Sequence, residues 1–65
     1  MRIHVESRDF KKNVSFDGTT VGQLMKALKL NSENFVISRN GEIVLEDEAL
    51  KDRDNVKLFP VISGG

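Results

Sequence analysis

The stretch TVGQLMKAL, residues 20–28, interrupts an otherwise alternating chain and decides its fold. Four apolar residues in it fall at positions i, i+3, i+4 and i+7, which is one face of a helix: Val21, Leu24, Met25 and Leu28. Thr20 and Gln23 have the spacing of a capping box, in which each side chain satisfies a backbone N–H group of the first turn. The stretch therefore predicts an amphipathic helix of about three turns that covers an apolar surface.

The residues that follow predict where this helix ends. Lys26 and Lys29 lie toward its carboxyl end, where the helix dipole favours positive charge. Asn31 tolerates the left-handed backbone conformation that often closes a helix. We therefore expect Asn31 to adopt that conformation and to end the helix.

Two segments before the helix alternate between apolar and polar residues. Apolar residues occupy odd positions in residues 1–7 and even positions in residues 10–16. A period of two is typical of strands with one buried face. The polar Ser-Arg-Asp between the two segments suits a hairpin turn, so we expect these strands to pair.

A second pair of strands is predicted after the helix. Asn40-Gly41 lies between two apolar runs, residues 35–39 and 42–45. Both turn residues tolerate positive φ, which makes this the strongest short-range hairpin signal in the chain. Residues 46–54 are acidic and turn-like, and Leu50 is their expected core anchor.

The last alternating segment is residues 55–60. Its even positions, including Leu58, are expected to face inward, and its odd positions, including Phe59, to face outward. Pro60 has no N–H group to donate, so we expect it to end the regular pairing. A free tail is expected after it.

This order of elements predicts an α+β fold in which one helix packs on one face of a mixed sheet of four or five strands. The arrangement that fits best is the ubiquitin-like β-grasp. We expect one β-grasp domain over residues 1–60 and a flexible C-terminal Gly-Gly tail over residues 61–65.

Composition narrows the classes of partner. The chain has 65 residues, and ten basic residues balance ten acidic ones, so it lacks the positive field expected of a nucleic-acid binder. The absence of cysteine excludes disulfides, thiolate metal sites and a cysteine nucleophile, and favours the cytoplasm. No membrane span or signal-peptide pattern is recognisable. We expect protein or small-molecule partners, and neither nucleic acid nor membrane.

Few side chains suggest catalysis. His4 lies on the outward face of the first predicted strand without an evident relay partner, and is expected to be an ordinary solvent-facing residue. Residues 46–48 are all acidic, but adjacent carboxylates project in different directions and lack the spacing of a calcium loop. We expect a solvated turn there and no metal site.

The end of the sequence, FPVISGG, allows two interpretations of equal weight. The two final glycines could be accidental, or they could form an arm thin enough to carry the carboxylate of Gly65 into another protein's active site. Phe59 is similarly open, since it could dock a partner or pack under the loop of residues 46–54. The same question applies to the apolar residues that follow it.

The whole chain resembles the ubiquitin-like sulfur carriers of the ThiS and MoaD families, which serve thiamin and molybdopterin biosynthesis. The resemblance is most specific in DNVKLFPVISGG, residues 54–65. VISGG and the short length are closest to ThiS, whereas Pro60 after Leu58-Phe59 is similar to the MoaD carriers. The Gly-Asp turn usual before the last strand is replaced by Arg53-Asp54, which affects that turn.

The resemblance implies a chemistry for the carboxylate of Gly65. A ubiquitin-activating-type partner enzyme would adenylate it with ATP and magnesium, and sulfur from a donor such as a cysteine desulfurase would displace AMP. The resulting thiocarboxylate would deliver sulfur to an acceptor biosynthetic enzyme. Gly64 and Ser63 would form the arm. The expected partner-binding residues are Phe59, Pro60, Val61 and Ile62.

This scheme requires no catalytic side chain, nucleotide site or metal in the chain itself, so we expect a protein that is not an enzyme and binds no cofactor. Two alternatives remain open. A protein modifier would use the same activated Gly65 to acylate lysines of targets. A β-grasp binding module would carry an inert tail.

Overall fold

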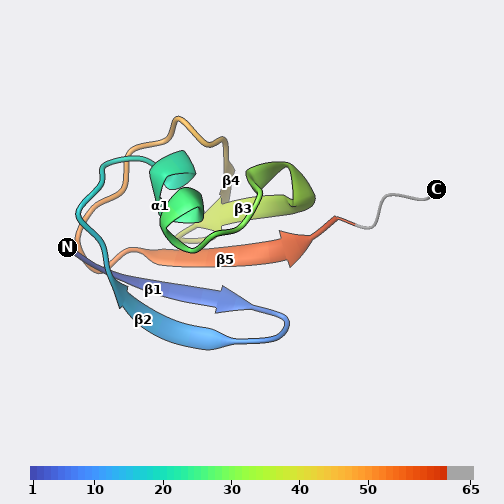
Figure 1. Ribbon diagram of the computed structural model, residues 1–65, viewed down its shortest axis with the longest axis horizontal. Helices are drawn as coiled ribbons and strands as arrows, with labels where there is room; N and C mark the ends of the chain where they lie inside the picture. The colour runs from blue at the N-terminus through green and yellow to red at the C-terminus, as the bar shows by residue number, and fades with distance from the viewer. Residues whose placement is uncertain (62–65) are drawn as a thin grey trace.

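The computed structural model describes residues 1–61 and contains a five-stranded sheet crossed by one α-helix (Figure 1). The elements follow the chain as β1 (Arg2–Ser7), β2 (Lys11–Ser15), α1 (Val21–Ala27), the 3₁₀ turn η1 (Ser32–Asn34), β3 (Phe35–Arg39), β4 (Glu42–Val44) and β5 (Asn55–Pro60). In the sheet the strands are ordered β2-β1-β5-β3-β4. The predicted α+β fold of ubiquitin-like β-grasp type, with a mixed sheet and one helix, is confirmed.

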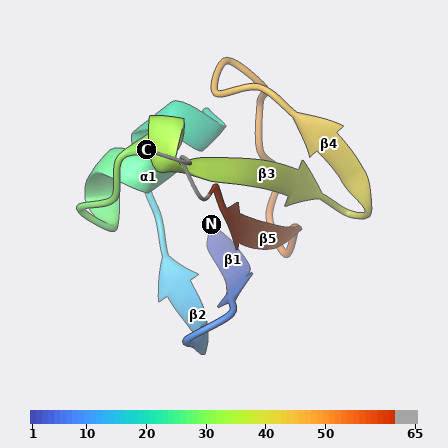
Figure 2. The same cartoon turned by 90° about the vertical axis from the view of Figure 1, so that its right-hand side faces the viewer.

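The sheet is mixed because its two central strands run in the same direction. β1 and β5 pair in parallel, with Val5 opposite Val56, while the β1–β2, β3–β4 and β3–β5 pairs are antiparallel. Figure 2 shows that the sheet is strongly twisted and that α1 lies on one of its sides. The parallel pair carries the C-terminal ends of β1 and β5 to the same end of the molecule.

The core fills the space between α1 and the sheet. Its buried members come from every layer: Ile3, Val5, Phe16, Val21, Leu24, Met25, Ile37, Leu50, Val56 and Leu58. Most of the inward positions predicted by alternation and by the helical period are confirmed, including Leu50 as the anchor of the loop. Met1 is an exception, since it is 38% exposed, and Phe10, Val14 and Leu28 are only partly buried. Apolar burial of this kind is the main stabilising contribution in a chain of this size.

The predicted capping box at the start of α1 is present. Thr20 Oγ1 accepts a hydrogen bond from the Gln23 backbone N–H at 3.3 Å, and Gln23 Oε1 accepts one from the Thr20 N–H at 3.1 Å. The N–H groups of Val21 and Gly22 donate to the carbonyls of Glu48 and Glu46 at 2.9 and 2.8 Å. The loop after β4 is thereby fixed on the helix start.

The predicted end of the helix is wrong in two respects. α1 ends at Ala27 and spans seven residues, about two turns, although Leu28 still packs on the core. Lys29, and not Asn31, takes the left-handed conformation, with φ of 61°. Asn31 instead caps η1, because its Oδ1 accepts a hydrogen bond from the Glu33 N–H at 3.0 Å.

The predicted Asn-Gly hairpin is confirmed between β3 and β4. Asn40 and Gly41 have φ of 51° and 90°, and Arg39 and Glu42 pair on either side of them. Two consecutive residues with positive φ give a turn whose twist matches that of the flanking strands. This turn fixes which side chains of β3 and β4 share a face.

Pro60 is the last residue of β5, so the regular strand ends there as predicted. It lies opposite Phe35 and is followed by one more backbone hydrogen bond, from the Val61 N–H to the Asn34 carbonyl at 2.8 Å. Antiparallel pairs alternate between hydrogen-bonded and non-hydrogen-bonded positions. Because Asn34 and Val61 form a bonded pair, Phe35 and Pro60 do not, and the missing N–H of proline costs nothing there.

Candidate functional site

The candidate site lies at the carboxyl end of β5, from which the predicted tail continues. Phe59 and Val61 are each 48% exposed, and Pro60 between them is also exposed. The predicted outward orientation of Phe59 is confirmed. Backbone pairing with β3 holds this segment in an extended conformation while its side chains remain accessible.

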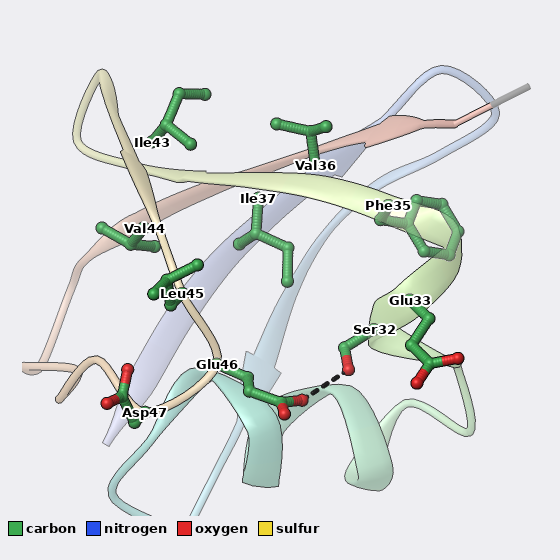
Figure 3. A pocket seen from close by; sticks show the side chains of 10 residues that line it. All are labelled: Ser32, Glu33, Phe35, Val36, Ile37, Ile43, Val44, Leu45, Glu46 and Asp47. Atoms are coloured by element: carbon green, nitrogen blue, oxygen red, sulfur yellow. Dashed lines mark hydrogen bonds between the residues drawn. The ribbon is translucent and has the colours of Figure 1, made fainter.

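Two further apolar side chains lie on the same face as Phe59. Val36 of β3 is directly opposite Phe59 and is 40% exposed, and Ile43 of β4 is 67% exposed. Ile43 is opposite Ser38, two residues along β3 from Val36, so both project from the same side of the hairpin (Figure 3). We call Val36, Ile43, Phe59 and Val61 the open-face patch.

The open-face patch lies on the side of the sheet away from α1. Ile37 and Leu58, which alternate with Val36 and Phe59, are buried against the helix side. The loop of residues 46–54 is bonded to the start of α1 and therefore lies over the other face. The alternative in which Phe59 packs under that loop is wrong.

The opposite end of β5 is fixed by a buried carboxylate. Asp54 is 6% exposed, and its Oδ2 accepts hydrogen bonds from Arg39 Nε at 2.6 Å and from the Lys51 N–H at 2.7 Å. Its Oδ1 accepts one from Asn40 Nδ2 at 3.0 Å. Asn55 is held in the same way, because its N–H donates to Asn40 Oδ1 at 2.9 Å.

This hydrogen bonding decides the ionisation of Asp54. Burial alone would raise the pKa of its carboxyl, but the hydrogen bonds from Arg39, the Lys51 backbone and Asn40 outweigh it. The pKa of Asp54 therefore lies below its ordinary value of 3.8. In return, the hydrogen bond to Asp54 raises the pKa of the Arg39 guanidinium.

The remaining predicted site residues lie outside the part that the structure describes. Ile62, Ser63, Gly64 and Gly65 follow Val61, so the predicted arm and the reactive carboxylate remain predictions. The structure brings together Phe59, Pro60 and Val61 directly before them. Val61, the first residue of the predicted tail, donates a hydrogen bond from its N–H to the Asn34 carbonyl.

The polar candidates weighed in the sequence form no catalytic group. His4 Nδ1 lies 2.9 Å from Asn13 Oδ1 on the exposed face of β1 and β2. Glu46 accepts a hydrogen bond from Ser32 Oγ, and Glu48 forms an ion pair with Arg39 at 3.3 Å. Over residues 1–61, no three His, Asp or Glu side chains gather as a metal ion would require.

Sequence reasoning missed Val36 and Ile43 as parts of the patch. Alternation alone shows that Val36 and Ile37 lie on opposite faces of the sheet, but not which of the two faces the helix covers. The Asn40-Gly41 turn could have shown that Ile43 shares a face with Val36, because a two-residue hairpin sets Ile43 opposite Ser38. The pairing of Val36 with Phe59 joins distant segments and had no local signal.

Comparison with known proteins identifies the family. A sequence model of the ThiS family matches residues 2–65. The chain belongs to the ThiS family. The predicted resemblance is thus confirmed, and with it membership of a group of ubiquitin-like sulfur carriers and modifiers.

Several solved structures share the fold of this ThiS-family chain. SAMP1 from Haloferax volcanii is 25% identical, with a TM-score of 0.75, and 100% of each chain is covered. A chain in the complex of subunits 1 and 2 of molybdopterin-converting factor from Helicobacter pylori 26695 is 20% identical, with a TM-score of 0.69 and 100% of each chain covered. A ubiquitin-like protein from Trypanosoma brucei is 17% identical, with a TM-score of 0.65, 88% of this chain and 89% of that chain being covered.

We compared the length and apolar character of the helices with what a membrane span requires. Among residues 1–61, no helix is both long and apolar enough to cross a bilayer. α1, with seven residues, is far below the roughly 20 residues that a span requires.

Proposed function

We propose that this ThiS-family protein is a sulfur carrier and that the carboxylate of Gly65 is its working group. A carboxylate is a weak electrophile. A partner enzyme transfers AMP from ATP to one carboxylate oxygen, which releases pyrophosphate and leaves an acyl-adenylate. Sulfide or a persulfide sulfur then attacks the carbonyl carbon, AMP leaves with its oxygen, and a terminal thiocarboxylate remains once any persulfide S–S bond has been reduced.

The single observation that carries the proposal is the family match over residues 2–65, which includes the final Gly-Gly. The structure supports it through the position of the open-face patch. Phe59 lies on β5 and Val61 directly follows this strand, so an enzyme that docks on this patch is next to the residues that follow in the sequence. An exposed apolar cluster with an aromatic member is typical of docking surfaces.

The chemistry assigns ATP and magnesium to the partner and no cofactor to this chain, which acts as a carrier and not as an enzyme. Small carriers of this family generally depend on other proteins for catalysis. The Helicobacter pylori neighbour, solved as a complex of two subunits, supports an acceptor enzyme as a further partner. A sulfur donor such as a cysteine desulfurase completes the set, and we place the cycle in the cytoplasm in thiamin or molybdopterin-type cofactor biosynthesis.

ATP–pyrophosphate exchange tests the proposal. Purified protein is mixed with candidate ubiquitin-activating-type enzymes, and we expect exchange that disappears when Gly65 is deleted, while circular dichroism stays unchanged. With a sulfur donor added, intact mass should rise by the difference between one sulfur and one oxygen. Exchange that persists without Gly65 would contradict the proposal.

The second candidate is a protein modifier, which the ubiquitin-like fold favours and which uses the same adenylate. Mass analysis of protein recovered from cells separates the two. Larger conjugates that vanish with Gly65 indicate modification of lysines, whereas a thiocarboxylate mass without conjugates indicates sulfur carriage. If deleting Gly64 and Gly65 changes neither growth nor partner binding, the chain is a β-grasp binding module with an inert tail.

A further inference from the structure

A groove of about 570 Å³ lies beside the β3–β4 hairpin, and its lining includes Val36 and Ile43, which also belong to the open-face patch. β3 and β4 bound it above, the segment after β4 bounds it on one side and η1 on the other (Figure 3). Its lining residues are Ser32, Glu33, Phe35, Val36, Ile37, Ile43, Val44, Leu45, Glu46 and Asp47. A hydrogen bond of 2.6 Å from Ser32 Oγ to Glu46 Oε2 joins the two sides.

The groove lies where one strand of the sheet stops short. β3 pairs with β5 over all its residues, from Phe35 to Arg39, but β4 pairs only with Ile37 to Arg39. Beside Phe35 and Val36 the β4 side of β3 has no neighbouring strand among residues 1–61. The sheet therefore has a notch that begins where the chain turns away at Leu45.

The backbone of Phe35 is oriented toward this notch. Asn34 and Asn40 are both hydrogen-bonded to the β5 side, through Val61 and Asn55 at 2.8 Å. Because backbone groups alternate in direction along a strand, those of Phe35 point to the β4 side. Its N–H donates to the Ser32 carbonyl within η1, which leaves its carbonyl oxygen directed at the groove.

The side chains of the groove combine an apolar wall with an acidic rim. Ile37 of β3 forms part of this wall, and Leu45 is 76% exposed at its edge. The lining includes three acidic residues, Glu33, Glu46 and Asp47, and neither lysine nor arginine. A segment that complements these features carries apolar side chains in the groove and positive charges at its ends.

We propose that this groove binds an extended segment of a partner protein, with alternate apolar residues flanked by lysine or arginine. The segment occupies the place in the sheet that β4 leaves empty. One of its N–H groups donates to the Phe35 carbonyl, its apolar side chains cover Ile37 and Leu45, and its basic residues face the acidic rim. Addition of a strand to a free sheet edge is an established mode of peptide recognition.

This inference does not depend on the proposed sulfur chemistry, because Gly65 takes no part in it, and Phe59 and Val61, the patch residues next to the tail, do not line the groove. Figure 3 shows that the side chains of Val36 and Ile43 project to one side of the β3–β4 hairpin, and those of Ile37 and Leu45 to the other. Two partners could therefore contact the protein at the same time, one on each side. Failure of the pyrophosphate exchange would leave the groove proposal standing, and the reverse also holds.

Nuclear magnetic resonance titration of the full-length, ¹⁵N-labelled protein tests the groove. The probe is a short synthetic peptide in which two valines at alternate positions are flanked by lysines. We expect amide shifts at Phe35, Val36 and Leu45 to Asp47 that saturate with peptide. A peptide with glutamates in place of the lysines should bind at least about fivefold more weakly, because its charges repel the rim.

Methylation of the peptide nitrogens tests the backbone contact. A methyl group removes the N–H that the Phe35 carbonyl accepts while it keeps the side chains, so we expect affinity to fall by about fivefold. If the methylated peptide binds as well as the parent, the strand-addition geometry is wrong.

Single substitutions test the residues of the groove. Asp47→Lys and Leu45→Ser should each weaken binding of the lysine peptide severalfold, at exposed positions where the fold is not at risk. Asp9→Lys, with the same charge change at the other edge of the sheet, and Val61→Ser, on the open-face patch, are matched controls that should bind as the parent does.

Three outcomes overturn the proposal. The peptide could cause no saturable shifts, the shifts could centre on Phe59 and Val61 instead of the groove, or the glutamate peptide could bind equally well. Analytical sedimentation of the protein without peptide tests whether a second copy of the protein occupies the groove. If the protein self-associates with rising concentration and Leu45→Ser abolishes this, the groove binds a second copy and not a partner segment.

Discussion

The two ends of β5 are held in contrasting ways. At its start, the Asp54 carboxylate accepts three hydrogen bonds and Asn55 is tied to Asn40. At its end, Phe59 and Val61 are held only by backbone pairing with β3, and half of each side chain is exposed. One strand is thus fixed in the fold at one end and presents exposed side chains for contacts at the other. Stability and recognition should then respond to separate substitutions.

The largest effect is expected in the middle of β5, where the inward side chains belong to the core. Leu58→Ala removes a side chain that is 2% exposed and should lower the free energy of unfolding by about 3 kcal/mol. A domain of this size has little stability to lose, so we expect a partly unfolded protein. Urea denaturation measures the loss. A change below 1 kcal/mol would show that the core does not depend on β5.

The next effect is expected at the anchored end. Asp54→Ala leaves the Arg39 guanidinium, the Asn40 amide and the Lys51 N–H without their shared acceptor and should cost about 2 kcal/mol. Asp17→Ala is the matched control at an exposed position and should change stability by less than about 0.5 kcal/mol. If the two substitutions lowered the free energy of unfolding equally, Asp54 would not be the anchor of β5.

The same carboxylate makes stability depend on acid pH. The pKa of Asp54 is lowered in the folded protein, so its contribution is complete above the pKa of an unfolded aspartate, near 4, and is lost as pH falls through the folded value. Wild type should therefore lose stability below about pH 4 more steeply than Asp54→Asn, which has no proton to take up there. Urea midpoints measured between neutral pH and pH 3 give the comparison. Parallel pH profiles would contradict it.

Local sequence signals predicted most of the fold. The Thr20 capping box, the Asn40-Gly41 turn and the alternation in the outer segments each depend on residues close together in the chain, and all were confirmed. The helix end was not, because Lys29 takes the left-handed conformation that local preference assigns to asparagine. At the helix end, the packing of Leu28 and Leu30 on the core outweighs the backbone preferences of the individual residues.

The candidate site was predicted only in part, because its geometry depends on register. The outward orientation of Phe59 follows from alternation within β5, but Val36 joins it only through the β3–β5 pairing. Pro60 is tolerated in β5 because it occupies a non-hydrogen-bonded position of that same β3–β5 pairing. The groove depends on where β4 stops, which is set by the loop bonded to the helix start. None of these long-range relations has a signal within a short stretch of sequence.

A smaller effect, of opposite sign, is expected just before the anchored end. Arg53 has φ of 68°, a conformation that is unfavourable for residues with a Cβ atom. Arg53→Gly should stabilise the protein by roughly 0.5 to 1 kcal/mol. Arg53→Ala, which also removes the charge but keeps the Cβ, is the control and should give no gain. If both variants gain equally, the side chain and not the backbone conformation is responsible.

The smallest effect on stability is expected at the exposed end of β5. Phe59→Ala removes a side chain from the open-face patch and should change the free energy of unfolding by less than about 1 kcal/mol. If the patch docks the activating enzyme as proposed, the same substitution should lower kcat/KM for pyrophosphate exchange by tenfold or more, as expected for an aromatic residue at the centre of an interface.

Lys12→Ala is the control for Phe59→Ala, because Lys12 is also exposed but lies on β2, an edge strand separated from β5 by β1. It should leave both stability and exchange near the wild-type values. Normal exchange with Phe59→Ala would show that the enzyme does not depend on Phe59. A large loss of stability with it would show that the outward side of β5 contributes to the fold as the inward side does, and the two sides of the strand would no longer have separate roles.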